Sequence, residues 1–197
     1  MKNIEVYPLF SSPVMHLQLD MAEVNLSNIN WGNNYTNSIS SSQNVLDLEE
    51  FASLREQCQT ALNEYFYKVM SVSPDVEIYI TESWFNKTEE GQVHHRHWHP
   101  NSIVSAVVFL QNDIDQGGEI TLITSKYEQL EFEVVEPNIF NSKSWSLPPL
   151  PGTALLFPSG VEHLVDPYRG KTPRISLSFN SFVRGDVNKL ALTKLKI

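Results

Sequence analysis

Histidines are the residues of this sequence whose type and spacing most directly suggest chemistry. The chain holds six, and His94, His95, His97 and His99 fall within six consecutive positions. Imidazole is the commonest metal ligand in proteins and suits Zn, Fe, Cu and Ni. Residues two apart on a strand share a face, so His97 and His99 would present two imidazoles side by side. On a regular strand His95 shares that face and His94 points the other way. A solvated basic loop or an adventitious metal patch would have the same composition.

A second group of polar residues follows downstream. His163 lies after the run Leu155–Ser159 and a turn at Gly160, and a strand that begins at Arg174 comes eleven residues later. In that strand Ile175, Leu177 and Phe179 alternate with Arg174, Ser176, Ser178 and Asn180. An arginine fork binds a carboxylate bidentately and a serine adds a donor, so this face suits a carboxylate beside a metal. A sandwich strand with a solvated polar face would account for the serines but less well for the arginine.

Most of the elements that must position these residues read as strands. Apolar residues at three- and four-residue steps predict one amphipathic helix over 48–70, with Asp47 as N-cap and Glu50 as capping-box partner. Short strands are expected at 4–9, 14–19, 76–86, 92–98, 103–111, 118–124, 130–136, 153–158, 162–166 and 173–183. The Asn- and Ser-rich segment 25–44 is expected to be a loop. This order indicates a mainly β, double-sheet barrel with one supporting helix.

Composition excludes several classes of protein. The 197 residues carry 14 Lys and Arg against 23 Asp and Glu, a net charge of −9, which argues against a nucleic-acid or anionic-membrane binder. The single cysteine, Cys58, excludes an internal disulfide and a zinc site of the Cys-x-x-Cys type.

We expect one domain over 1–197. Its parts are N-terminal strands, loop and helix (1–75), a core with the metal site (76–183) and a C-terminal tail (184–197). No targeting or membrane-spanning segment is apparent, and a soluble, cytoplasmic protein is expected.

With these residues in place, the chain resembles the iron(II)- and 2-oxoglutarate-dependent dioxygenases of the prolyl-hydroxylase type over 76–183. Gly91-Gln92 precedes the metal strand, His97-Trp98-His99 lies where that family has His-x-Asp, and Gly117-Gly118 matches its paired glycines. A group of uncharacterised oxygenases of bacteria and of tailed phages of marine cyanobacteria is more similar still. Its pattern resembles His97–Ser102, Phe157–His163, Arg174–Ser176 and Phe179-Asn180. A phage-encoded chain would act in the host cytoplasm.

The resemblance implies a double-stranded β-helix (jelly roll) whose cofactors are Fe(II), 2-oxoglutarate and O2. It implies decarboxylation of 2-oxoglutarate to succinate and CO2, coupled to hydroxylation of a substrate C–H bond. His97, His99 and His163 would be the iron ligands. Arg174, with Ser176 or Ser178, would bind the distal carboxylate of 2-oxoglutarate. Ser105, Asn86 and Asn180 are further pocket candidates, for which ordinary strand hydrogen bonding is the competing interpretation.

One departure from the family pattern leaves alternatives open. His99 takes the position of the usual carboxylate ligand; Asn101 could replace it in a shifted register, whereas Asp113 and Asp115 lie too far along. Three histidines would also suit a cupin-like enzyme that does not use 2-oxoglutarate, or a jelly-roll module with a structural metal. The substrate is not encoded in any motif; a protein or peptide side chain, with proline as first guess, is favoured by analogy. Segments 25–44 and 137–151 are candidate lids, and an oligomer is possible.

Overall fold

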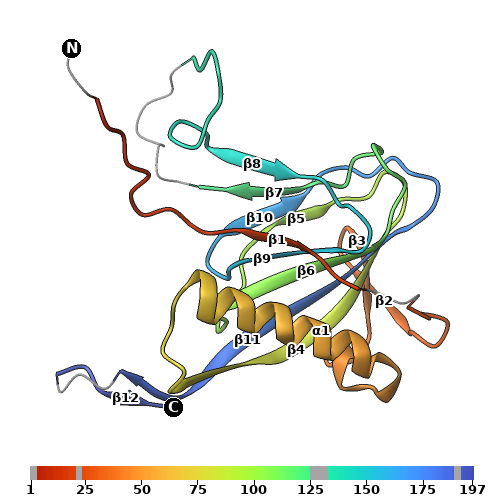
Figure 1. Cartoon of the computed structure of the whole chain (residues 1–197). Helices are drawn as coiled ribbons and strands as arrows, with labels where there is room; N and C mark the ends of the chain where they lie inside the picture. Colours follow the sequence, from red (N-terminus) through yellow and green to blue (C-terminus); the bar gives the residue numbers. More distant parts are fainter. Residues whose placement is uncertain (1–3, 21–23, 125–132, 189–191) are drawn as a thin grey trace.

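Two antiparallel sheets packed face to face form the body of the protein (Figure 1), which we describe from a computed structural model. The structure describes residues 4–20, 24–124, 133–188 and 192–197. In order across the larger sheet, the strands are β1 (Met15–Gln18), β9 (Thr153–Pro158), β6 (Val104–Gln111), β11 (Arg174–Asn188), β4 (Val76–Thr88), β3 (Asn37–Ser40) and β2 (Trp31–Asn34), and β12 (Leu195–Lys196) pairs with β11. The smaller sheet contains β5 (His94–His97), β10 (Glu162–Val165), β7 (Ile120–Ile123) and β8 (Ser144–Leu147). The prediction of a mainly β, double-sheet jelly roll with one main helix is confirmed.

The larger sheet buries both of its faces, and the alternation of its strands decides which residues go where. On β6, Val104, Ala106 and Val108 join the core cluster that includes the helix, whereas Val107 and Phe109 join a cluster formed with β7 and β9 between the sheets. On β11, Leu177 and Phe179 face the helix side. The polar residues between them therefore face the space between the sheets, as the alternation predicts.

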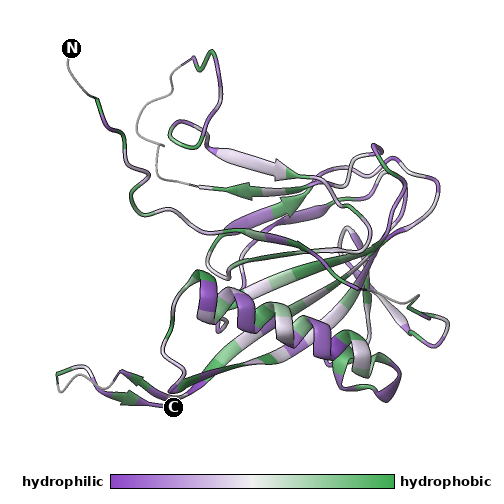
Figure 2. Cartoon of the chain, viewed as in Figure 1, coloured by the Kyte–Doolittle hydropathy of each residue, from purple (hydrophilic) through white to green (hydrophobic). Residues whose placement is uncertain are grey.

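The predicted helix is present, but it is built from three pieces. A 3₁₀ turn (Glu49–Phe51) leads into α1 (Ala52–Asn63), which continues as π-helix over Glu64–Val69. Its apolar side covers β4, β6 and β11, and the side turned to the viewer in Figure 2 is largely hydrophilic. The predicted Asp47 cap is wrong, because no side chain caps this start. An earlier 3₁₀ turn (Val45–Asp47) places Asp47 upstream, where it pairs with Arg55 at 3.1 Å.

The segment expected to be a loop, 25–44, instead contains the β2–β3 hairpin. Its polar side chains are compatible with burial because they pair with each other and with the backbone. Asn34 Nδ2 donates to Asn37 Oδ1 at 3.0 Å, and Ser40 Oγ accepts the buried Phe85 N–H at 3.0 Å while donating to the Ser42 carbonyl at 2.7 Å. The hairpin thus extends the edge of the sheet at β4 through polar contacts that hydrophobic periodicity does not detect.

Three other segments differ from the expected strands. Residues 4–9 are exposed and form no strand, since no described strand pairs with them. Of the expected strand 130–136, residues 130–132 lie outside the described part of the chain and 133–136 are irregular. Strand β8 lies in the proline-rich segment 137–151, where no strand was expected, and pairs with β7. Within the described ranges, no helix is long and apolar enough to cross a membrane.

Candidate functional site

Three histidines meet at one end of the smaller sheet. His97 on β5 and His163 on β10 are directly paired across the sheet, and His99 follows two residues after His97. Their ligand nitrogens all lie within 4.8 Å of one another, and the Nε2 atoms of His99 and His163 are 3.3 Å apart. No Asp or Glu of the described residues belongs to this group. The pairing of β5 with β10 therefore brings together His97 and His163, which are 66 residues apart in the sequence.

The tautomers of two of these imidazoles follow from their hydrogen bonds. His97 Nδ1 lies 2.7 Å from the carbonyl oxygen of His95, and His163 Nδ1 lies 3.0 Å from that of Val161. A carbonyl oxygen only accepts, so each Nδ1 carries the proton and donates it. Each Nε2 then keeps its lone pair free. In metal-binding histidines, the ring nitrogen that does not bind the metal typically donates its proton to a carbonyl or carboxylate oxygen in this way.

Burial keeps these imidazoles neutral. It lowers the pKa of His163 to about 3 and that of His99 to about 4, and His97 adds to both effects as a neighbouring positive charge when protonated. Burial also lowers the pKa of His97. All three imidazoles are therefore uncharged at neutral pH, with one ring nitrogen protonated and the other free, the state in which imidazole binds a metal.

The donor set fits a divalent metal ion. Two nitrogens bound side by side to one ion at about 2.1 Å lie about 3 Å apart, close to the observed 3.3 Å. His163 Nε2 carries a lone pair, so without an ion the short contact requires a proton on His99 Nε2. Three uncharged nitrogen donors suit Fe, Zn, Cu or Ni better than Mg or Ca, which prefer oxygen.

Residues behind His99 fix its orientation. Its ring stacks on Trp84, with centroids 5.7 Å apart, and Asn180 hydrogen-bonds its side chain. Asn180 Oδ1 in turn accepts from Ser105 Oγ at 2.9 Å. Ser105 and Asn180 do not line the cavity described below, so they lie in a layer that supports the histidine. Asn101 is exposed in a turn with φ 56° and does not line the cavity described below.

Arg174, the first residue of β11, is almost fully buried. Its Nε donates to the Gly118 carbonyl at 3.0 Å and its Nη1 to Ser176 Oγ at 3.2 Å, with the guanidinium carbon 5.4 Å from the centre of the Phe109 ring. Burial lowers its pKa to about 10, so it is still charged at neutral pH. Within the described residues its buried Nη2 has no hydrogen-bond partner, and no carboxylate forms an ion pair with it.

Gly118 makes room for this arginine. Its φ is +74°, and a Cβ added there would lie 2.9 Å from Arg174 Cδ and 3.2 Å from Tyr168 Cδ2. Sequence reasoning identified the paired glycines only as part of a family pattern. The structure gives the physical reason, because any side chain at position 118 would meet the arginine.

The three histidines and Arg174 line one cavity between the sheets. Ser176 and Ser178 line it from β11, and Asn86 from β4; Asn86 Nδ2 lies 3.1 Å from Ser178 Oγ, and its buried Oδ1 is unpaired. The remaining lining residues are Trp84, His94, Ala106, Val107, Ile120, Phe157 and Val165. Sequence reasoning missed Trp84, although its position two residues before Asn86 on the same strand already placed both on one face.

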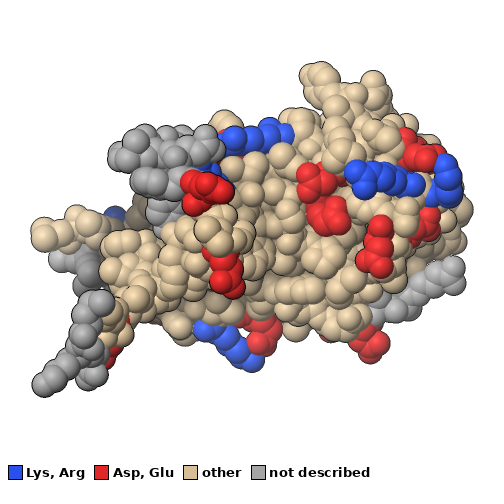
Figure 3. All heavy atoms as spheres, turned by 90° about the horizontal axis from the view of Figure 1, so that it is seen from above, with Lys and Arg blue, Asp and Glu red and all other residues tan. Residues whose placement is uncertain are grey.

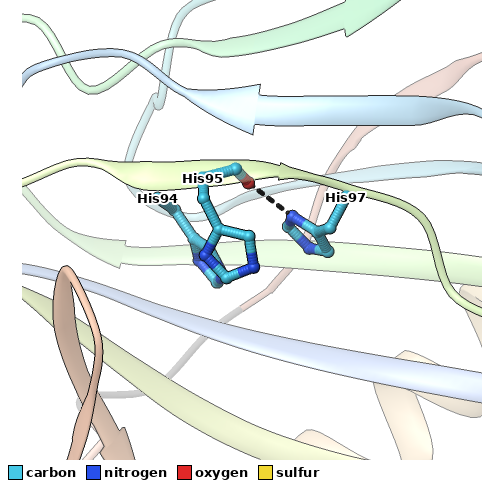
Figure 4. Close-up of side chains that lie close together, drawn as sticks. All are labelled: His94, His95 and His97. Atoms are coloured by element: carbon cyan, nitrogen blue, oxygen red, sulfur yellow. Dashed lines mark hydrogen bonds between the residues drawn. The ribbon is translucent and has the colours of Figure 1, made fainter.

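The predicted orientation of His94 is wrong. On a regular strand it would point away from His95 and His97, but it lines the cavity with His97, and the ligand nitrogens of all three residues lie within 4.8 Å of one another. His95 shares the side of His97 as predicted and is exposed. The reason is a β-bulge: His163 pairs with His97 and Val165 with His94, so three steps on β5 oppose two on β10. The extra residue shifts the alternation. Figure 4 shows the three side chains on β5, with the hydrogen bond from His97 to the His95 carbonyl dashed.

Comparison with known families identifies the same region. A family model described as "Putative 2OG-Fe(II) oxygenase" matches residues 82–180, which include every residue that lines the cavity. No curated protein matches the chain.

Solved structures share the fold at low sequence identity. A prolyl-4-hydroxylase of Pseudomonas putida superposes with a TM-score of 0.54 at 15% identity, covering 86% of this chain and 93% of that one. HygX of Streptomyces hygroscopicus, solved with nickel and 2-oxoglutarate, gives 0.58 at 11%, covering 86% and 82%. The α-ketoglutarate-dependent epimerase SnoN of nogalamycin biosynthesis gives 0.62 at 12%, covering 94% and 86%. These likenesses show that the double sheet is the double-stranded β-helix of such enzymes.

Proposed function

Because the chain belongs to the family described as "Putative 2OG-Fe(II) oxygenase", we propose that His97, His99 and His163 hold its iron(II), and that Arg174 binds the distal carboxylate of 2-oxoglutarate. The protein is a 2OG-Fe(II) oxygenase. Bound iron(II), with 2-oxoglutarate and O2, supplies oxidative decarboxylation to succinate and CO2 coupled to oxidation of a substrate. The substrate oxidation we propose is hydroxylation of a C–H bond.

The observation that carries the co-substrate assignment is the buried guanidinium of Arg174, whose Nη2 has no hydrogen-bond partner among the described residues. A charged guanidinium without a counter-ion is costly to bury, by several kcal/mol. Arg174 lines the cavity that the three histidines also line, and its buried Nη2 has no hydrogen-bond partner among the described residues. A carboxylate there would receive a charge-assisted hydrogen bond and neutralise the buried charge. Ser176 holds Nη1 in place and offers its hydroxyl to the same anion.

The three-histidine set changes the charge of the site relative to the usual pair of histidines and a carboxylate. With neutral imidazoles only, a bound Fe²⁺ keeps its full double charge, and Arg174 adds a third positive charge. We expect this to strengthen the attraction for the 2-oxoglutarate dianion in a cavity of low dielectric.

Asn86 and Ser178 complete the polar wall of the proposed co-substrate site. The unpaired Asn86 Oδ1 becomes satisfied if the amide is flipped, because Oδ1 then accepts from Ser178 Oγ. The amide Nδ2 would in that orientation be the unpaired group, a donor that an anion could satisfy. The apolar residues Val107, Ile120 and Phe157 also line the cavity and exclude water from it.

For the substrate we propose a protein or peptide side chain, with proline first. The likeness to a bacterial prolyl-4-hydroxylase supports this choice by analogy of fold. The hairpin β2–β3 brings the exposed Tyr35 edge-on to His95, with centroids 6.3 Å apart, so this polar hairpin lies beside the site and is a candidate substrate lid. On the face seen in Figure 3, basic side chains are scattered among acidic ones, which with a net charge of −9 favours a neutral or basic substrate over nucleic acid.

Anaerobic titration of the metal-free protein with iron(II) and then 2-oxoglutarate tests the assignment. Chelation of 2-oxoglutarate by iron(II) gives a visible charge-transfer band, and we expect it in the natural protein. Arg174→Met removes the charge while keeping a long side chain, so the protein should fold but bind 2-oxoglutarate at least tenfold more weakly. Arg184→Met is the matched control, since Arg184 lies further along β11 and is paired with Glu77 in the exposed part of the strand.

Iron binding without the band would indicate a cupin-like enzyme or a structural metal and would refute the co-substrate assignment. Equal 2-oxoglutarate affinity in Arg174→Met and Arg184→Met would refute the role of Arg174. Proline-containing peptides and their alanine counterparts, scored for succinate release and gain of one oxygen atom in the peptide, test the substrate class. No gain of oxygen over a broad peptide set would exclude it.

A further inference from the structure

A second group of imidazoles lies beside the first. His94, His95 and His97 place their ligand nitrogens within 4.8 Å of one another. Their ring centroids are 4.5 Å apart for His94 and His97, 5.1 Å for His94 and His95, and 5.3 Å for His95 and His97. Figure 4 shows the three rings gathered under β5. We call this group the outer site, and His97, His99 and His163 the inner site.

The bulge in β5 creates the outer site. On a regular strand, His94 and His95 would point to opposite faces. The extra residue between the His94–Val165 and His97–His163 pairs lets neighbouring side chains approach the same ion. The two sites also differ in access from solvent: His95 is exposed, whereas His163 is only 5% exposed. An ion arriving from solution can therefore meet His95 before it meets His163.

His97 belongs to both groups but can serve only one ion at a time. Its Nδ1 carries the proton donated to the His95 carbonyl, which leaves Nε2 as its single free lone pair. An ion bound to Nε2 in the outer site therefore removes one of three ligands from the inner site.

We propose that His94, His95 and His97 form a second divalent-metal site, selective for ions such as Zn²⁺, Cu²⁺ and Ni²⁺, whose occupation excludes iron from the inner site. The exclusion rests on the proposed assignment of His97 to iron. Three imidazoles and a water complete the four-coordinate shell that Zn²⁺ prefers. Nitrogen sites bind Fe²⁺ more weakly than Ni²⁺, Cu²⁺ or Zn²⁺, so the outer site should discriminate against iron.

Cobalt(II), whose visible spectrum reports its coordination, tests the outer site by itself. His163→Ala disables the inner site, and we expect this variant still to bind one Co²⁺ per chain. Adding His95→Ala should weaken that binding at least tenfold. Adding His16→Ala instead is the matched control, because His16 is an exposed histidine on β1, outside both groups. Absence of Co²⁺ binding in His163→Ala, or equal binding with and without His95, overturns the proposal.

Competition tests the exclusion. Zinc added to the natural protein with iron(II) and 2-oxoglutarate should bleach the charge-transfer band, and His95→Ala should require at least fivefold more zinc. The same zinc requirement in both proteins means that zinc acts at the inner site, and overturns the exclusion. If the natural protein forms no band at all, the proposed function fails, whereas the cobalt result still decides whether the outer site exists.

Discussion

Replacing Gly118 by alanine tests whether close packing against Arg174 controls co-substrate binding. The added Cβ meets Arg174 Cδ at 2.9 Å and Nε at 3.2 Å. The arginine cannot swing away cheaply, since Nε and Nη1 are both hydrogen-bonded. Tyr168, on the other side, is fixed by its hydroxyl, which donates to the Thr172 carbonyl at 2.6 Å and accepts the Asp113 N–H at 2.8 Å.

Two terms set the expected loss of stability. Alanine at φ +74° costs about 1–2 kcal/mol in backbone strain. Overpacking against a filled neighbourhood adds about 1–3 kcal/mol, so Gly118→Ala should lower the free energy of unfolding by about 2–5 kcal/mol. Gly91→Ala is the matched control, because Gly91 has φ +81° and a Cβ there would meet nothing within 4 Å. Gly91→Ala should show the strain term alone, about 1–2 kcal/mol.

The same pair of variants separates packing from ligand binding. If Gly118→Ala displaces the guanidinium, 2-oxoglutarate loses a hydrogen bond to a charged group, worth about 1.5–3 kcal/mol, or about 10- to 150-fold in Kd. Urea unfolding measures the first effect, and anaerobic titration of the charge-transfer band measures the second. The reasoning is refuted if Gly118→Ala binds 2-oxoglutarate as tightly as Gly91→Ala does.

Three further predictions concern other parts of the molecule. His163→Ala should weaken iron(II) binding at least tenfold in equilibrium dialysis while His16→Ala leaves it intact; equal iron affinity in the two variants would remove His163 from the ligand set. Ser40→Ala should destabilise the protein to urea by about 1–3 kcal/mol, because it leaves the buried Phe85 N–H unpaired, and an unchanged midpoint would contradict this. Burial raises the pKa of Cys58 to about 12, whereas its ordinary value is 9.0, so unfolding releases a proton above pH 9. Stability should fall by about 2 kcal/mol between pH 9 and 10.5, and by less in Cys58→Ala at the same pH values.

The sequence predicted the features of the fold that depend on hydrophobic alternation. On β11, Leu177 and Phe179 pack toward the helix and Ser176 and Ser178 face the cavity, as their period of two indicates. The helix also followed from its period. The start of the helix was not predicted correctly. Two successive 3₁₀ turns precede the helix in place of the expected cap at Asp47, and local capping patterns do not describe such a start.

The errors share one physical cause, which is that tertiary pairing overrode a local pattern. The β2–β3 hairpin is held by polar contacts to β4, so its composition resembles that of a loop. The bulge in β5 depends on pairing with β10, more than sixty residues downstream, so parity alone assigned His94 to the wrong face. The lack of a hydrogen-bond partner for Arg174 Nη2 likewise depends on the three-dimensional surroundings of this residue. The strand pattern at 174–180 indicated only which residues share a face with Arg174.

The placement of Arg174 links the stability of the fold to the chemistry proposed for it. Strand β11 lies between β6 and β4, so its backbone is paired on both sides. One face of this strand contributes Leu177 and Phe179 to the core under the helix, and the other carries the buried cation. A shift of β11 by one residue would exchange the two faces and bury the polar side chains against the helix. The hydrophobic core therefore fixes the position of the cation. Adaptation to a new substrate should then occur in the β2–β3 hairpin, which lies beside His95 and joins the sheet only at its edge.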